Sequence, residues 1–326
     1  MTSVTELSTV VEQRDPGGRR WRNRELLING AFAVAFVVLL VVAATTTESF
    51  LTDDNITNLL RQSVTTGLLS LGMLMVILTG GIDLSVGSVV ALAGIVAAGL
   101  AADLPVPLAM AIGIATGVAC GAINGVLVAH FRLAPFVVTL AALTTIRGLS
   151  YVYSETPITP TEISFLTLGT ETIGPIPIAA LIVLVAFALA WVFLTRTTVG
   201  RSIVAIGGNS EAVRLAGINV PRHVLLTYVI SGLLAGLAGV ILASRVGIAQ
   251  PSVGVAFELN AIAACVIGGA RLSGGRGSVL GTLGGVVLLA LIDNLLTLYE
   301  VQRYWQQVLK GLIIVAVVLA RRRDDS

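Results

Sequence analysis

Apolar runs of about 20 residues follow one another along most of this chain, and they constrain its fold more than any other feature. Only 12% of the 326 residues are charged, against about 25% in a soluble domain, and the mean hydropathy is +0.95. The runs are continuously apolar and do not alternate, which excludes a membrane β-barrel. The chain is therefore expected to be an all-α, polytopic transmembrane helical bundle.

The runs predict about ten spans, with short or broken helices among them. The spans are placed near 26–44, 63–80, 84–102, 106–129, 134–153, 176–195, 224–244, 257–270, 278–297 and 303–320. The second, third and eighth are short or interrupted by glycine, which favours broken or re-entrant helices there. Residues 1–25 are expected to be a disordered basic tail, 26–320 the transmembrane domain, and 321–326 a second tail.

The distribution of arginine predicts the orientation of these spans. With the N-terminus in the cytoplasm, 15 of the 20 Lys and Arg residues fall at cytoplasmic ends. They are residues 14, 19, 20, 22, 24, 132, 196, 201, 214, 222, 271, 276, 321, 322 and 323. Both termini are thus expected in the cytoplasm, and the acidic segment 154–175 outside.

The residue inventory argues against an enzyme. Cys120 and Cys265 lie in apolar runs, and His130 and His223 have no ligand partners nearby in sequence, so neither a disulfide framework nor a metal site is expected. Lys310 is the only lysine and Gly311 follows it, so a GxxxxGK[ST] phosphate loop cannot exist in these residues. No catalytic residue and no cofactor is expected, and any energy from ATP must come from a partner.

The segment Gly200–Ile218, GRSIVAIGGNSEAVRLAGI, is polar enough to stand out from its apolar surroundings. Asn209 or Ser210 can cap a short helix that places Ala212 and Leu215 on one apolar face, and Gly217 can end it in a left-handed conformation. Such a helix either lies on lipid or docks in a groove of a soluble partner. The candidate docking residues are Gly200, Arg201, Gly208, Asn209, Glu211, Ala212, Leu215 and Gly217.

Two segments share the pattern GGxxLS followed by GS: residues 80–88, GGIDLSVGS, and residues 268–278, GGARLSGGRGS. Paired glycines break a helix and allow close backbone approach, and nearby serines can satisfy the freed amides. The pattern indicates a parallel repeat with both copies at the cytoplasmic side, as either tight interhelical turns or broken helices near a pathway. Its candidate residues are Gly80, Gly81, Ser85, Gly268, Gly269 and Ser273.

Polar side chains inside the spans are the candidates for a transport pathway, because an unpaired polar group is costly in a membrane. They are Asn124, Glu258, Asn260, Asp293 and Asn294. Amide and carboxylate groups suit sugar hydroxyls, which both donate and accept hydrogen bonds. The alternative is that these side chains hold helices together.

Three stretches carry a resemblance to a known family: LTGGIDLSVGSVVALAG, RTTVGRSIVAIGGNSEAVRLAGINV and AQPSVGVAFELNAIAACVIGGARLSGGRGSVLGTLGG. In this order and spacing they resemble the ribose-type permease subunits of ABC importers of monosaccharides. The resemblance implies a coupling loop at 196–223 within a permease domain, and a location in the bacterial cytoplasmic (inner) membrane.

The resemblance also implies the partners: an ABC ATPase subunit with two nucleotide-binding domains, an extracytoplasmic sugar-binding protein, a second permease copy or paralogue, and lipid, but no nucleic acid. The implied substrates are ribose, xylose or related small sugars and polyols. The alternative is a stand-alone secondary transporter driven by H⁺ or Na⁺, with Asp83 or Asp293 carrying the coupling.

Overall fold

A computed structural model describes residues 36–38 and 40–322 and divides the chain into two compact units, Met1–Phe50 and Leu51–Ser326. The described part of the first unit contains helical residues within Phe36–Thr46. The predicted tail 1–25 lies outside the described residues, as do most of the predicted span 26–44 and the last four residues of the chain.

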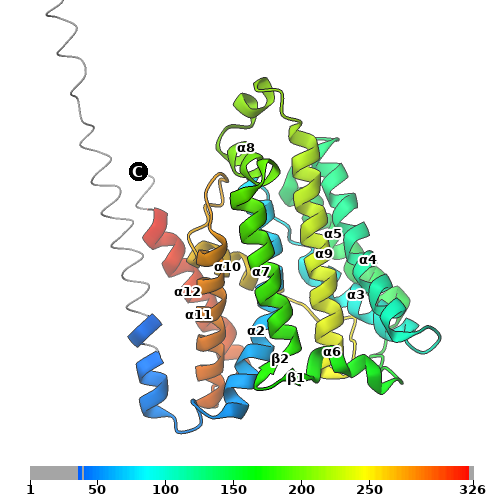
Figure 1. The fold of residues 1–326 in the computed structure, drawn as a ribbon, viewed down its shortest axis with the longest axis vertical. Helices are drawn as coiled ribbons and strands as arrows, with labels where there is room; N and C mark the ends of the chain where they lie inside the picture. The colour runs from blue at the N-terminus through cyan, green and yellow to red at the C-terminus, as the bar shows by residue number, and fades with distance from the viewer. Residues whose placement is uncertain (1–35, 39, 323–326) are drawn as a thin grey trace, which may run out of the picture. The chain divides into compact units, whose positions relative to one another are not determined.

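The second unit is almost entirely helical (Figure 1), which confirms the predicted class. Its main helices are α2 (Asp53–Leu78), α3 (Val86–Leu100), α4 (Val106–Ala129), α5 (Pro135–Tyr153), α7 (Ile178–Arg196), α8 (Thr198–Leu215), α9 (Val220–Val246), α10 (Phe257–Ile267), α11 (Val279–Leu298) and α12 (Arg303–Arg322). The segment between α5 and α7 holds the short η1 (Ile163–Leu166), α6 (Thr167–Thr170) and an antiparallel pair, β1 (Thr172–Ile173) and β2 (Ile176–Pro177). The strand pair is the small exception to an all-α fold.

The observed helices follow the predicted spans closely, with two clear errors, both at the second span. The span predicted at 106–129 is α4 to the residue, whereas the span predicted to begin at 63 begins at Asp53. The side chain of Thr52 caps α2 by accepting a hydrogen bond from the amide of Asn55, and Asp53 and Asp54 occupy its first turn. Acidic residues there interact favourably with the helix dipole, so the polar sequence before residue 63 continues the helix.

Six of the described helices are long and apolar enough to cross a membrane: α2, α4, α5, α7, α9 and α11. Helices α3 and α10 are apolar but have only 15 and 11 residues. At about 1.5 Å per residue they are shorter than a hydrocarbon core of about 30 Å. The count of ten full spans is therefore not confirmed. Short or broken helices were expected at the second, third and eighth positions; short helices are confirmed at the third and eighth, whereas the second is wrong, because α2 is one continuous helix of 26 residues.

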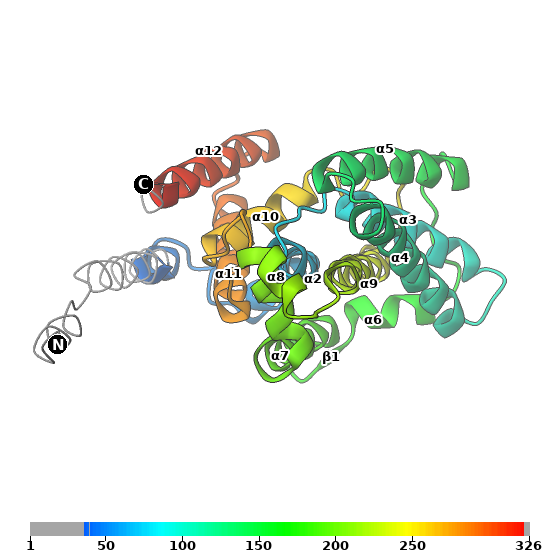
Figure 2. The same ribbon diagram turned by 90° about the horizontal axis from the view of Figure 1, so that it is seen from above.

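Helix α9 lies at the centre of the second unit and packs against α2, α3 and α4 (Figure 2). It approaches α4 through facing glycines, because a Cβ atom at Gly117 would overlap the carbonyl oxygen of Gly232 and one at Gly232 would overlap that of Gly117. Small residues that let two helices touch are the usual basis of helix packing in membranes. Helices α3, α4 and α9 therefore form a close-packed group within the second unit.

Candidate functional site

Helix α8 consists of two helical segments that meet at Asn209, whose backbone is non-helical (φ −159°, ψ 94°). The Asn209 Oδ1 atom accepts a hydrogen bond from the amide of Ala212 at 2.9 Å, so the predicted cap is confirmed. Gly217 follows with φ +81°, the left-handed conformation predicted for the end of this helix. Both ends of the second segment are thus fixed by local hydrogen bonding and backbone geometry.

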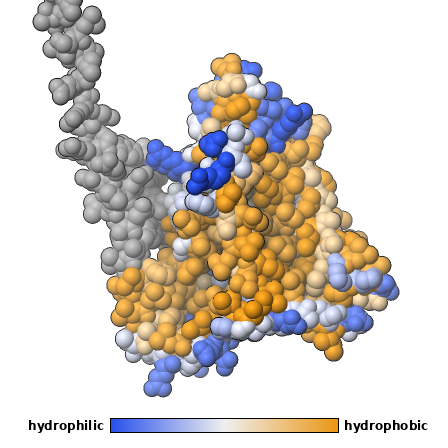
Figure 3. Space-filling view, viewed as in Figure 1, coloured by the Kyte–Doolittle hydropathy of each residue, from blue (hydrophilic) through white to orange (hydrophobic). Residues whose placement is uncertain are grey.

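The apolar side chains of this second segment are largely uncovered. Val213 is buried, whereas Ala212 and Ala216 are exposed and Leu215 is 74% exposed. Figure 3 shows an apolar band across the middle of the visible face with hydrophilic atoms at both ends, and apolar atoms lie among the hydrophilic ones at the end that carries α8. An exposed leucine beside two alanines on a capped helix is a surface that a protein partner can cover.

A charged pair flanks that apolar face. The Arg214 guanidinium donates two hydrogen bonds to the Glu211 carboxylate, from Nε to Oε2 at 2.9 Å and from a terminal nitrogen to Oε1. These bonds hold the pKa of the Glu211 carboxyl below its usual range. Both side chains are well exposed, so the pair contributes little to folding stability and leaves a charged edge beside the apolar face.

The first segment of α8 ends in a backbone contact with two distant parts of the chain. The amide of Gly275 donates to the carbonyl oxygen of Leu78 at 3.1 Å. A Cβ atom at Gly207 would overlap both of these groups, and one at Gly274 would lie 2.9 Å from the amide nitrogen of Gly80. We name Leu78, Gly80, Gly207, Gly274 and Gly275 the glycine junction. It brings the two GGxxLS segments together at one end of the bundle, as a parallel repeat requires, and α8 packs against both of them.

The segment between α2 and α3 is also anchored deeper in the bundle, by the buried carboxylate of Asp83. Its Oδ1 atom accepts from the amide and the hydroxyl of Ser85, at 3.1 and 2.6 Å, and its Oδ2 atom accepts from the hydroxyl of Ser231 on α9 at 2.9 Å. Asn124 on α4 donates to the Ser85 hydroxyl at 2.9 Å. Ser85 was predicted to satisfy freed amides, but its own amide donates to Asp83 instead. These three donated hydrogen bonds, together with the position just before the positive end of the α3 dipole, stabilise the buried carboxylate of Asp83.

The starts of α3 and α10 touch beyond this anchor. A Cβ atom at Gly87 would overlap the carbonyl oxygen of Gly254 and would lie 2.8 Å from a carboxylate oxygen of Glu258. On α5, the Arg147 guanidinium donates to the carbonyl oxygen of Pro251 at 2.6 Å and so holds the loop that leads into α10. The candidate Glu258 therefore lies at the contact of two short helices.

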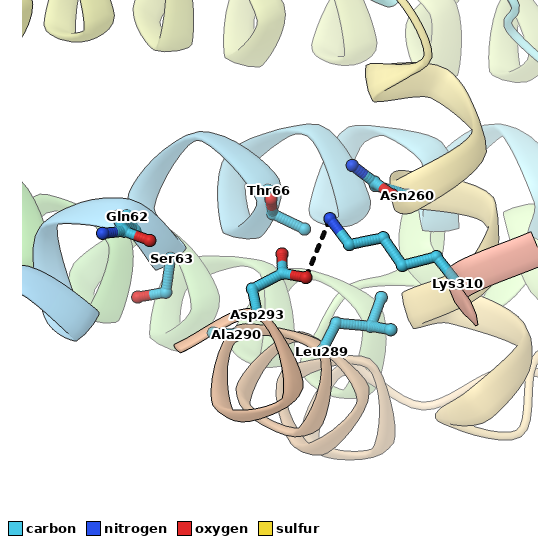
Figure 4. Close-up of a pocket in the computed structure, with 8 residues that line it drawn as sticks. All are labelled: Gln62, Ser63, Thr66, Asn260, Leu289, Ala290, Asp293 and Lys310. Atoms are coloured by element: carbon cyan, nitrogen blue, oxygen red, sulfur yellow. Dashed lines mark ion pairs between the residues drawn. The ribbon is translucent and has the colours of Figure 1, made fainter. Parts of the chain in front are cut away.

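A small polar cavity lies between α2, α10, α11 and α12 (Figure 4). Lys310 extends from α12 to the Asp293 carboxylate on α11, with 2.8 Å between Nζ and Oδ1, and Asn260 of α10 lies beside them. The cavity is also lined by Gln62, Ser63, Thr66, Leu289 and Ala290. Its volume of about 20 Å³ admits a water molecule but is far below the roughly 300–1,000 Å³ of a small-molecule site.

Asn294, the neighbour of Asp293, lies outside that cavity lining. Its side chain is 5% exposed and exchanges two hydrogen bonds with Asn55 of α2, at 3.1 and 2.7 Å. Of the five pathway candidates, only Asn260 and Asp293 are brought together. Sequence reasoning missed Lys310, Gly207 and the hydroxyls of α2, because only the fold brings them beside residues of other segments.

Six long apolar helices, with short apolar helices and glycine-rich turns between them, are the architecture of a multi-pass membrane protein. The chain belongs to the family described as branched-chain amino acid transport system / permease component, which matches residues 55–318.

Curated relatives extend the match over almost the whole chain. The ribose import permease protein RbsC of Bacillus subtilis is 44% identical over 91% of this chain and 93% of its own length. RbsC of Escherichia coli K12 is 39% identical over 94% of this chain and 98% of its own length. The galactose/methyl galactoside import permease MglC of the same organism is 35% identical over 90% and 93%. The comparison with solved structures found no match.

These matches confirm the resemblance read from the three sequence stretches. The family and the relatives are permeases, so the prediction of a transport subunit that is not an enzyme is also confirmed.

Proposed function

We propose that this chain is the permease subunit of an ATP-driven importer that moves a monosaccharide, of the ribose type, across the bacterial inner membrane. The sugar is delivered by an extracytoplasmic binding protein. Relatives named for ribose and galactose import, 35–44% identical over about nine-tenths of the chain, support this substrate class. The hydroxyl and amide groups around Asn260 and the Asp293–Lys310 pair, whose charges cancel, suit an uncharged polyol.

The observation that carries the ATP-driven mechanism is the uncovered apolar face of Ala212, Leu215 and Ala216. It lies on a rigidly capped helix within the proposed coupling loop 196–223, and its occupant is the ATPase subunit. A partner must supply ATP hydrolysis, since the only lysine of the chain cannot form a phosphate-binding loop. Helix-in-groove docking is the recognition mode that such a face fits.

The pathway lies between two permease copies, related as a homodimer or as paralogues. A cavity of about 20 Å³ in one copy is too small for a sugar, which supports a route completed by a second copy. The permease domain extends over 26–320 with about ten membrane-associated segments, α3 and α10 among them as short ones. Both termini and α8 face the cytoplasm, as the distribution of arginine favours.

The test is to purify the complex after changing one face of α8. Ala212→Asp and Gly217→Trp should leave a membrane-inserted permease that no longer retains its ATPase and no longer stimulates ATP hydrolysis when sugar-loaded binding protein is added. Ala102→Asp is the matched control, because Ala102 is exposed in the loop between α3 and α4. Wild-type ATPase binding by both α8 variants would remove α8 as the docking element.

A further inference from the structure

The glycine junction is built from main-chain atoms of three segments that are distant in sequence. Gly207 of α8 fits against the Leu78 carbonyl group and the Gly275 amide, and no Cβ atom can be accommodated there. Gly274 and Gly275 have φ values of +92° and +74°, which only glycine adopts without strain. Contacts between main chains have no flexible side chain that can absorb a displacement, so the three segments must move together.

Each segment continues into a different part of the bundle. Beyond Gly80 the chain passes Asp83, which holds it to α9, and reaches Gly87, which touches Gly254 before α10. The loop that contains Gly275 is closed at its base by contact between Gly268 and Gly281, which joins α10 to α11. The junction therefore connects α8 with both helices, α10 and α11, that supply Asn260 and Asp293 to the polar cavity.

We propose that the glycine junction transmits the movement of α8 to α10 and α11, with Gly207 and Gly275 as positioning residues. This rests on the proposed function, in which the ATPase moves α8. Movement of the proposed docking surface displaces the Leu78–Gly80 turn and the Gly274–Gly275 loop as one body. A small displacement at α8 thereby reaches the pathway helices through packed contacts.

Two helical glycines provide a matched pair of variants. Gly207→Ala introduces a Cβ atom into the junction, whereas Gly148→Ala on α5 places the same group in open space, with nothing within 4 Å. Each variant is purified with its ATPase and binding protein and reconstituted in liposomes, and ribose uptake and ATP hydrolysis are measured in the same vesicles. The ratio of ribose imported to ATP hydrolysed should fall at least about fivefold for Gly207→Ala and remain at the wild-type value for Gly148→Ala.

The ratio distinguishes coupling from a general structural role, because a merely less stable protein loses both activities in proportion. A wild-type ratio for Gly207→Ala, or an equal loss for Gly148→Ala, would overturn the proposal. If wild-type vesicles show no ATP-dependent uptake, the proposed function itself fails. If wild-type vesicles take up ribose and the Gly207→Ala variant is fully coupled, only the role of the glycine junction is refuted and the proposed function stands.

A measurement on the wild-type complex covers the case in which Gly207→Ala does not assemble. Hydrogen–deuterium exchange is compared without nucleotide and with a non-hydrolysable ATP analogue. Peptides covering 76–82 and 272–278 should change their exchange rates together with peptides of α8, while peptides of α4 stay constant. A change confined to α8 would contradict transmission through the junction.

Discussion

The ion pair between Asp293 and Lys310 gives a prediction whose magnitude follows from its geometry. Neutralising one partner by Lys310→Met or Asp293→Asn leaves the other charge unpaired among the helices, and an unpaired charge at the centre of a membrane helix costs about 2.5–3.5 kcal/mol. The two side chains remain 20% and 31% exposed, so each single variant should lose roughly 2 kcal/mol of folding stability. That loss corresponds to a melting temperature lower by about 4–8 °C.

The double variant shows whether the stability is lost through the broken ion pair or through each side chain separately. Asp293→Asn with Lys310→Met removes both charges, and its stability should return to within about 1 kcal/mol of wild type. The double-mutant cycle then yields an interaction energy of about 3 kcal/mol, measured by thermal unfolding in detergent. Asp103→Asn, at an exposed position, is the control and should leave the melting temperature unchanged. Additive losses in the double variant would refute the reasoning.

Three further expectations follow from buried or paired groups. Asn294→Leu and Asn55→Leu should each destabilise the protein, and the double variant should lose less stability than the sum of the two losses, with a coupling energy of about 1 kcal/mol in thermal unfolding. Additive losses would show that the amide pair contributes nothing. Tyr228→Phe should keep or raise the melting temperature, since the buried hydroxyl finds no hydrogen-bond partner among the described residues; a lower melting temperature or lost ribose uptake would contradict this. Because the pKa of Glu211 is lowered, its pair with Arg214 is complete above about pH 4.3 and is lost only as the pH falls through the lower folded value. Glu211→Gln should therefore weaken co-purification of the ATPase as much at pH 5 as at pH 8. If the variant and the wild type bound the ATPase equally at pH 5, the lowered pKa of Glu211 would be refuted.

Local sequence features predicted the helices because each depends on neighbouring residues. The run at 106–129, the cap at Asn209 and the left-handed Gly217 were all predicted, and each rests on a few adjacent positions. Hydropathy failed at the start of α2, since Asp53 and Asp54 favour the first turn of a helix yet lower the local hydropathy.

Partners that are distant in sequence could not be predicted in the same way. Asn294 was grouped with Asp293 because the two are adjacent, yet its partner is Asn55, on another helix. Successive residues of a helix point in different directions, so adjacency does not place two side chains in one cavity. The repeat of GGxxLS was visible in the sequence, but only the fold brings both copies against Gly207.

The source of energy for uptake tests the central claim most directly. Labelled ribose uptake is followed in cells that express the chain with its ATPase and binding protein, first with ATP depleted and the ion gradients maintained, then with the gradients collapsed by ionophores and ATP maintained. An importer driven by its ATPase should stop in the first condition and continue in the second. Uptake that survives ATP depletion and stops with the ionophores would contradict the account and establish an ion-coupled transporter instead.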